Sequence, residues 1–451
     1  MQEVLDRLTR WQDQARQRLD AFSPVKVQGR VIQVNGILLE CSLPAARIGD
    51  LCSIKGNRGA DVLAEIVGFN ADTALLSALG ALDGIEAGAP IQPYYQSHCI
   101  TINDSLMGCV LDGFGRKLQG PTEAFTLSPK DAHPVIADAL APTQRPRISS
   151  PMPTGVRAID GLLTIGEGQR IGVFAGAGCG KTTLLAELAR NMPCDAIVFG
   201  LIGERGRELR EFLDHELDDE LRARSVLVCS TSDRTSMERA RAASTATAIA
   251  EGFRAQGKRV LLLIDSLTRF ARAQREIGLA AGEPPGRGGF PPSVYTMLPR
   301  LVERAGNMEG AGSITALYTV LIEGDVIAGD PVADEVRSLL DGHIILSRKL
   351  AEKNHYPAID VLGSISRTMT NVTVQEHISA AGRIRNLMSA YKEVEMLLRL
   401  GEYEKGHDRV TDAAVELNPT INQFLQQAMR DPTPYEDTLQ ILSQVSSHAQ
   451  I

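Results

Sequence analysis

The chain has 451 residues, of which 43% are apolar and 23% are charged. This length predicts about three domains of ~150 residues and a large buried core, which excludes a disordered tail and a disulfide-stapled mini-domain. With 47 basic against 55 acidic residues the net charge is −8. That balance argues against a general nucleic-acid binder, although a local basic channel is compatible with it.

The sequence predicts a protein of the cytoplasm. Its longest aliphatic run, residues 260–264, is far shorter than the ~18 residues of a membrane-spanning helix. Residues 1–20 are charged throughout and lack the apolar core of a signal peptide. The seven Cys residues form no CxxC pair, so we expect reduced thiols rather than disulfides or a zinc site.

An amphipathic helix is predicted over residues 1–22. Its apolar positions recur every three or four residues and are Val4, Leu8, Trp11, Ala15 and Leu19. This helix either packs on its own domain or docks on a partner chain, and a tryptophan on the apolar stripe is typical of a docking anchor.

Residues 23–95 are predicted to form a small antiparallel β-barrel or β-sandwich. Short runs rich in Val, Ile and Leu alternate there with Gly, Asn and Asp at regular spacing.

Residues 96–370 show the pattern of an α/β nucleotide-binding domain. Continuous apolar runs alternate with helical segments, as expected for a mostly parallel sheet buried on both faces. The predicted strands cover residues 170–176, 195–203, 225–231, 259–265, 313–321 and 342–347. Helices are predicted between them, for example over residues 181–192 and 236–257.

Residues 371–451 return to helical periodicity and are predicted to form a C-terminal helical domain. The pattern is clearest over residues 380–400 and 420–430.

The strongest chemical signal is a P-loop between a strand and a helix. Backbone N–H groups of such a loop surround nucleotide phosphates, Lys181 brings a positive charge to them, and the Thr182 hydroxyl ligates Mg²⁺. Ala175 replaces the first glycine of the motif, where a small residue suffices. The predicted nucleotide-binding residues of this loop are Gly176, Ala177, Gly178, Cys179, Gly180, Lys181, Thr182 and Thr183.

Two carboxylates complete the predicted site. Asp265 ends an apolar strand and is expected to hold Mg²⁺ through water; its alternative role is to cap the following helix. Glu204 ends a strand that we expect beside the P-loop strand, where a carboxylate polarises the water attacking the γ-phosphate. Arg205 is expected to orient or neutralise Glu204, although such a charge cluster alone is more typical of a solvated surface.

With these motifs the chain resembles the catalytic ATPases of bacterial type III secretion systems, which are related to the flagellar export ATPase and the rotary ATP synthase catalytic subunit. The matching segments are residues 112–120, 154–185, 200–208, 265–277, 279–285, 293–306, 312–321, 334–351 and 355–367. The resemblance is weaker at both ends of the chain. Two features favour a secretion ATPase over a rotary subunit: Cys179 in the P-loop and a complete catalytic set in one chain.

The resemblance implies the roles given above for the P-loop, Glu204, Arg205 and Asp265, and it adds two residues. Tyr356 matches the aromatic that packs against adenine, and its alternative is a core aromatic. Arg367 matches the arginine finger that reaches the γ-phosphate of a neighbouring subunit, where it would neutralise charge developing in the transition state. Its alternative is a structural ion pair.

The fold implied by the resemblance is a RecA-like P-loop ATPase core with an N-terminal β-barrel and a C-terminal helical domain. The implied function is Mg-dependent ATP hydrolysis that energises type III protein secretion, by releasing chaperones, unfolding effectors and delivering them to the export gate. The ATP sites are expected between subunits of a ring, most simply a hexamer. This places the protein in the cytoplasm, peripheral at the cytoplasmic face of the inner membrane.

The partners implied by the resemblance are a stator-like regulator at the N-terminal helix, a central stalk protein, chaperone–effector complexes and the export gate; no nucleic acid is expected. The Gly/Pro-rich loop 282–292 is expected to line the ring channel and contact exported polypeptide, which substitution of Phe290 or Val294 would test, unless it is a plain surface loop. Three other functions stay open: a flagellar export ATPase, an RNA-dependent ring helicase and a non-catalytic rotary subunit.

Overall fold

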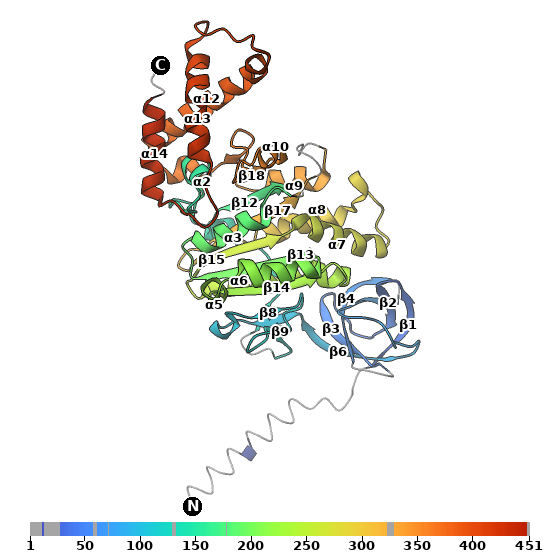
Figure 1. The fold of residues 1–451 in the computed structure, drawn as a ribbon. Helices are drawn as coiled ribbons and strands as arrows, with labels where there is room; N and C mark the ends of the chain where they lie inside the picture. The colour runs from blue at the N-terminus through green and yellow to red at the C-terminus, as the bar shows by residue number, and fades with distance from the viewer. Residues whose placement is uncertain are drawn as a thin grey trace, which may run out of the picture. The chain divides into compact units, whose positions relative to one another are not determined.

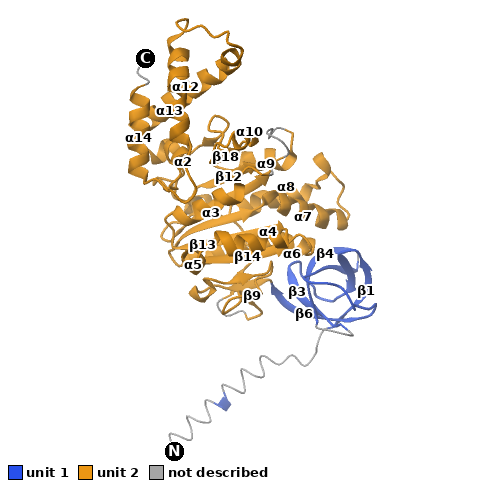
Figure 2. Cartoon of the chain, in the orientation of Figure 1, with its two compact units in different colours: residues 1–97 blue, residues 98–451 orange. Residues whose placement is uncertain are grey.

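The computed structural model describes residues 11–12, 28–56, 61–70, 72–128, 132–176, 178–322 and 329–448. The chain forms two compact units, residues 1–97 and 98–451 (Figure 2). The predicted docking helix, except for residues 11 and 12, and Ala177 of the P-loop lie outside the described residues. Within the described part of the chain, no helix combines the length and the apolar character needed to cross a bilayer.

The first unit is a closed six-stranded antiparallel barrel, so the choice between barrel and sandwich is settled. Its strands are β1 (Gly29–Asn35), β2 (Leu38–Ser42), β3 (Asp50–Ile54), β4 (Val62–Asn70), β5 (Thr73–Ala78) and β6 (Pro90–Ser97). They pair in the order β1-β2-β5-β4-β3-β6, and β6 closes the barrel on β1. Leu39, Cys52 and Leu76 are fully buried in its core.

The second unit is built on a ten-stranded sheet with seven parallel strands at its centre. The order is β19-β18-β12-β17-β15-β13-β14-β8-β9, and β16 pairs with β17. The bounds are β8 (Val110–Leu111), β9 (Lys117–Gln119), β12 (Arg170–Ala175), β13 (Ala196–Glu204), β14 (Ser225–Thr231), β15 (Arg259–Asp265), β16 (Gly306–Asn307), β17 (Ser313–Leu321), β18 (Gly342–Leu346) and β19 (Ile365–Ser366). A small antiparallel sheet, β10-β7-β11, comprises β7 (Cys99–Thr101), β10 (Phe125–Thr126) and β11 (Ala132–Pro134).

Helices cover this sheet and continue beyond it as a C-terminal bundle (Figure 1). They are α2 (Arg157–Leu162), α3 (Lys181–Asn191), α4 (Gly206–Glu211), α5 (Asp219–Ala223), α6 (Ser236–Ala255), α7 (Leu267–Ala280), α8 (Pro292–Val302), α9 (Pro331–Leu339), α10 (Arg348–Glu352), α11 (Met369–Val372), α12 (Gln375–Leu400), α13 (Arg409–Leu425) and α14 (Tyr435–Ser447). A π-helical segment, Phe212–Glu216, extends α4, and single 3₁₀ turns occur at Asp104–Leu106, Pro142–Gln144 and Arg287–Gly289. Helix α12 packs against α13, α14 and α2, which joins the bundle to the sheet.

Alternate residues of the central strands enter two separate cores, because successive side chains of a strand point to opposite faces. On β13, Phe199 belongs to the core that contains α3 and the C-terminal helices, whereas Val198 belongs to the core that contains α6 and α7. This two-sided burial explains the continuous apolar runs in the sequence. The predicted fold class is therefore confirmed, with barrel, nucleotide-binding sheet and helical bundle in that order along the chain.

One predicted pair of adjacent strands is wrong. We expected the strand that carries Glu204 to lie beside the P-loop strand, but β17 and β15 lie between β12 and β13. Consecutive strands of a parallel sheet are joined by crossovers, so their order along the chain does not fix their order in the sheet. All four strands run parallel, and their carboxyl ends meet at one edge, where ligands bind in such folds.

The loop 282–292 is buried near its carboxyl end and mostly exposed elsewhere. The side chain of Phe290 is 8% exposed and Val294 is fully buried, and both belong to the core beneath α7. The Arg275 guanidinium covers the Phe290 ring at 5.6 Å. Phe290 and Val294 are therefore not the side chains that this segment offers to a polypeptide. Residues 282, 284–288 and 292 are exposed, and the expected channel lining by this loop stays a prediction.

Helix α13 ends earlier than its periodicity predicts. The pattern extends over residues 420–430, but the helix stops at Leu425. Residues 426–433, which we call the C-terminal strap, then cross the nucleotide-binding edge in extended and turn conformations. Pro432 and Pro434 follow closely and are incompatible with continuation of the helix.

Candidate functional site

The P-loop connects the carboxyl end of β12 to the start of α3. Gly178 and Gly180 have left-handed φ angles of 79° and 80°, which glycine adopts without strain. Gly180 caps α3, so the free N–H groups of the first helical turn point toward the loop. A helix terminus of this kind attracts phosphate. The space beside Gly178 is open, since a Cβ placed on this glycine would meet no atom within 4 Å.

Lys181, the first residue of α3, faces the ends of two neighbouring strands. Its Nζ donates to Asp265 Oδ1 at 2.6 Å and lies 3.8 Å from Glu204 Oε1. The Thr319 hydroxyl on β17 donates to the same Asp265 oxygen at 2.6 Å. Asp265 is 5% exposed, and an ammonium and a hydroxyl together hold its carboxylate in one orientation. The structure thus brings together Lys181, Glu204 and Asp265 as predicted.

Glu204 lies at the carboxyl end of β13, and its side chain is 12% exposed. Burial raises the pKa of its carboxyl above the ordinary value and Asp265 adds to this, whereas Arg269 and Lys181 oppose the shift. A carboxyl with a raised pKa is suited to accept a proton from water near neutral pH.

Arg269, rather than Arg205, is the arginine paired with Glu204. Arg269 Nη1 forms an ion pair with Glu204 Oε1, and its side chain is 22% exposed. The Arg205 side chain is 74% exposed and its guanidinium pairs with Glu208 at 3.4 Å. Arg205 still lines the wider cavity, but the structure records no contact between it and Glu204.

Sequence reasoning therefore missed Arg269 and Thr319. A signal existed for Arg269, because it follows Asp265 by four residues in the first turn of α7 and lies within the segment that carries the resemblance. Thr319 also lies in a segment that carries the resemblance, but its distance from Asp265 along the chain gives no signal of contact. Its hydroxyl reaches Asp265 because β17 and β15 are neighbours.

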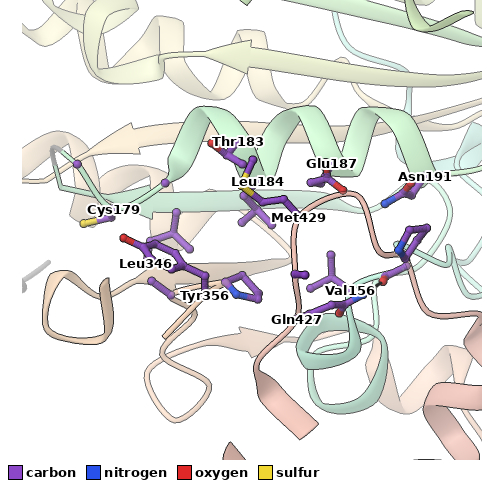
Figure 3. Close-up of a pocket in the computed structure, with 17 residues that line it drawn as sticks. Val156, Cys179, Thr183, Leu184, Glu187, Asn191, Leu346, Tyr356, Gln427 and Met429 are labelled. Atoms are coloured by element: carbon purple, nitrogen blue, oxygen red, sulfur yellow. Dashed lines mark hydrogen bonds between the residues drawn. The ribbon is translucent and has the colours of Figure 1, made fainter. Parts of the chain in front are cut away.

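Two cavities meet at the P-loop. The larger, of 830 Å³, is lined by charged and polar residues including Lys181, Thr182, Glu204 and Asp265. The smaller, of 300 Å³, is mainly apolar and is lined by α3, Tyr356 and the C-terminal strap. In Figure 3 Tyr356 lies below the P-loop and Met429 approaches from the strap side. A polyanion in the larger cavity and a flat base in the smaller one fit this division.

The donor set fits a magnesium ion bound together with phosphate. The described residues contain no group of three or more His, Cys, Asp or Glu arranged to hold a metal by themselves. Mg²⁺ in nucleotide sites requires only one or two protein oxygens, because phosphates and water supply the others. Thr182 and Asp265, both lining the larger cavity, offer such oxygens.

Arg367 lies outside both cavities. Its side chain is exposed and its backbone N–H donates to Asp341 O at 2.9 Å. Arg367 is thus not among the residues that line the cavities of its own chain. Tyr356 is 41% exposed, so the alternative that it is a core aromatic is excluded. Cys179 is buried and lines the smaller cavity.

Three family models match consecutive parts of the chain. Residues 31–94 match the β-barrel domain and residues 155–366 the nucleotide-binding domain of the ATP synthase alpha/beta family. Residues 373–444 match the T3SS EscN ATPase C-terminal domain.

Whole-chain comparisons agree with these matches. The chain is 67% identical over 443 residues to the type 3 secretion system ATPase of Pseudomonas syringae pv. tomato, covering 98% of each. It is 44% identical over 427 residues to the flagellum-specific ATP synthase of Bacillus subtilis, covering 94% of this chain and 96% of that protein. The solved structure of the assembled ATPase EscN from the enteropathogenic E. coli type III secretion system superposes with a TM-score of 0.86 at 46% identity, covering 93% of this chain and all of that one.

Proposed function

Because this chain belongs to the family of type III secretion system ATPases, and is thus an ATP hydrolase, we propose that it energises protein export by releasing chaperones, unfolding effectors and delivering them to an export gate at the inner membrane. The observation that carries the proposal is the convergence of Lys181, Glu204 and Asp265 in one cavity. The 67% identity to a secretion ATPase supports the export role over a flagellar one, because two flagellum-specific ATP synthases are 44% and 47% identical.

In this proposal each residue of the larger cavity has a separate task. Lys181 and the N–H groups at the start of α3 bind the β- and γ-phosphates. Glu204 orients the attacking water and accepts its proton, and Arg269 keeps Glu204 in place. Thr182 and Asp265 would hold Mg²⁺, which when bound neutralises phosphate charge. Arg205, being exposed, is assigned no contact with the reacting atoms.

The base occupies the smaller cavity in this proposal. Tyr356 offers a flat aromatic surface beside Gly180, since a Cβ on that glycine would lie 3.8 Å from the Tyr356 ring. The nucleotide-binding residues are therefore those of the P-loop, residues 176–183, together with Tyr356. Ala177 is included on the resemblance alone.

We further infer that the working form is a homo-oligomeric ring, most simply a hexamer, with Arg367 acting on the site of its neighbour. Two observations support this: Arg367 is exposed outside its own cavities, and a similar solved structure is described as assembled EscN. A second, with a TM-score of 0.83, contains EscN and its central stalk EscO, which supports a stalk partner for this chain. A stator-like regulator and chaperone–effector complexes remain proposals from the resemblance, as does a cytoplasmic location at the inner membrane.

A turnover experiment tests the catalytic assignment. We expect Glu204→Gln to retain ATP binding and to lower kcat by at least about a hundredfold, because the amide cannot accept the proton of water. Arg205→Ala, the matched control one residue away, should retain most of the activity. Equal losses in the two variants, or undiminished turnover in Glu204→Gln, would contradict the assignment.

The export role needs a separate assay. A strain that lacks its own secretion ATPase should regain effector secretion when it carries this chain and should not regain it with Glu204→Gln. Restored motility in a flagellar mutant without restored effector secretion would favour the flagellar function instead. Hydrolysis that depends on added single-stranded RNA would favour the helicase, and binding without turnover in the wild type the non-catalytic subunit.

A further inference from the structure

The smaller cavity is built from segments that are far apart in the sequence. The P-loop and α3 form one side, Tyr356 and Pro357 a second, and the C-terminal strap the third, through Ala428, Met429 and Pro432. Figure 3 shows Gln427 and Met429 on the strap, on the far side of the cavity from the P-loop. The strap follows a helix of the C-terminal bundle, so one wall of the cavity does not belong to the sheet that carries the P-loop.

The strap is held in place through Gln427. Its backbone N–H donates to Tyr356 O at 2.9 Å, and its Nε2 donates to Gly155 O at 2.7 Å. Its Oε1 accepts the backbone N–H of Arg157 at 2.9 Å. The side-chain amide of Gln427 is thus engaged in hydrogen bonds within the wall.

Arg157 joins the nucleotide-binding domain to both the end of α13 and the strap. Its Nε donates to Phe424 O at 2.8 Å and its Nη2 to Gln423 O at 3.4 Å and to Gln426 O. Its Nη1 donates to Thr433 Oγ1 at 3.2 Å, at the other end of the strap. One guanidinium therefore spans both ends of the segment that forms the wall.

The chemistry of the contact explains why an arginine is needed. The last four carbonyls of a helix have no partner inside the helix and carry partial negative charge. A guanidinium has five N–H donors in a planar fork, so it binds several carbonyls at once, whereas a lysine ammonium is a point charge. Arg157 thus binds the free carbonyls at the end of α13 and is bonded to the strap that follows.

We propose that the Arg157 side chain is a positioning group for nucleotide binding, which acts through the end of α13 and the strap to hold Met429 against the base. The inference rests on the proposed function, because it assigns the smaller cavity to the base. Arg157 lines neither cavity: the smaller one is lined by Gly155 and Val156 but not by Arg157, and the larger one lacks all three. Its effect is therefore confined to ligands that carry a base.

The test compares ATP with inorganic tripolyphosphate, which has the phosphates but no base. Arg157→Ala should raise the dissociation constant for ATP roughly tenfold and leave that for tripolyphosphate within about twofold. It should raise the KM for ATP more than it lowers kcat, as expected when ground-state binding is lost. Arg157→Lys retains the charge without the fork, and should show a smaller loss in the same direction.

A double-variant cycle separates positioning from general damage. Met429 is 60% exposed, so Met429→Ala removes the wall contact without opening a core. If Arg157 acts through the strap, Arg157→Ala added to Met429→Ala should weaken ATP binding by much less than tenfold. Arg383→Ala is the matched control, because Arg383 joins α12 to Ser446 of the C-terminal bundle at 3.2 Å and lies outside both cavity linings.

The outcomes are distinct. Equal weakening of ATP and tripolyphosphate binding in Arg157→Ala and Arg157→Lys would show general damage and overturn the proposal, as would unchanged ATP binding in both. Additive losses in the double variant would show that Arg157 does not act through the wall. A wild-type chain that bound tripolyphosphate no less tightly than ATP would contradict the assignment of the smaller cavity to a base, whereas wild-type binding without hydrolysis would contradict the proposed function.

Discussion

At the scale of single residues, Asp265 is held by two donors on one of its oxygens. Lys181 and Thr319 both donate to Oδ1, which leaves Oδ2 directed away from these two contacts. Removal of the Thr319 hydroxyl would leave the Lys181 ammonium as the main partner of this oxygen. Thr319 is therefore expected to fix the carboxylate in the orientation that a metal ion needs.

Thr319→Val tests this role with little change in side-chain volume. We expect it to raise the Mg²⁺ concentration required for half-maximal turnover by about tenfold or more, because losing a hydrogen bond to a charged group costs about 1.5–3 kcal/mol. Thr319→Ser should restore the wild-type requirement. An unchanged Mg²⁺ dependence in Thr319→Val, with normal folding by circular dichroism, would contradict the role.

His98 gives a pH-dependent contribution to stability. The ring is 2% exposed and its Nε2 donates to Phe114 O at 2.9 Å. Burial, assisted by the nearby Arg241, lowers the pKa of His98 from 6.5 to about 3. Between these values the unfolded chain binds a proton that the folded chain does not bind. The contribution of His98 to the free energy of unfolding is therefore fully present above pH 6.5 and is lost as the pH falls toward 3.

We expect the free energy of unfolding to fall by about 1.4 kcal/mol from this group between pH 7.5 and 5.5. His98→Gln retains a donor for Phe114 but does not titrate, so its loss over the same interval should be smaller by about that amount. Urea unfolding at the two pH values measures the difference. Identical losses in wild type and variant would show that His98 is protonated in the folded state.

The residues near Glu204 show how far sequence reasoning reaches. Lys181 and Thr182 could be assigned from sequence, because the P-loop fixes their positions within a few residues of chain. The arginine that pairs with Glu204 could not be assigned from sequence, because Arg205 and Arg269 both lie near a predicted strand end. The choice depends on which way α4 and α7 direct their side chains, and that is set by packing between distant segments.

At the scale of elements, the strands were predictable and their order was not. Runs such as Val260–Ile264 are apolar at every position, because both faces of the central sheet are covered. Nothing in such a run specifies its neighbour, and β17 lies between the P-loop strand and β15 although it follows both in sequence. The end of α13 was missed for a related reason: its carbonyls are bound by Arg157, which lies more than 260 residues earlier.

The loop 282–292 gives a prediction at this scale. Phe290→Ala should lower the free energy of unfolding by about 3–5 kcal/mol, because it leaves a cavity in the core beneath α7. Arg287→Ala, in the exposed part of the loop, removes an ion pair with Asp334 and should cost less than about 1 kcal/mol. Denaturant unfolding distinguishes the two. Full stability in Phe290→Ala would restore the interpretation in which this side chain faces a channel.

At the scale of the whole molecule, the catalytic site needs a second copy of the chain if Arg367 is to take part. Glu204 and Arg367 then belong to different subunits at every active site. We expect Glu204→Gln and Arg367→Ala each to be inactive alone, and their mixture to recover part of the wild-type turnover. In a mixed ring, an Arg367→Ala subunit offers its intact Glu204 to the Arg367 of a Glu204→Gln neighbour.

Specific activity of the wild type should also rise with protein concentration until rings are complete. The control is a mixture of wild type with Lys181→Ala. The specific activity of this mixture should fall below that of the wild type, because Lys181→Ala subunits regain no turnover in a mixed ring. If the Glu204→Gln and Arg367→Ala mixture stays inactive while both variants form rings, Arg367 does not act on a neighbouring site.

The two cavities rest on parts of the fold that differ in their resistance to local opening. Phosphates would contact the ends of β12 and β15, central strands whose amides are expected to exchange with solvent only on global unfolding. The base would contact a strap fixed by hydrogen bonds at its ends, whose amides are expected to exchange far sooner. Opening of the strap would release the base while the phosphates stay bound. Nucleotide exchange can therefore begin at the base end, without any loss of order in the sheet that carries the chemistry.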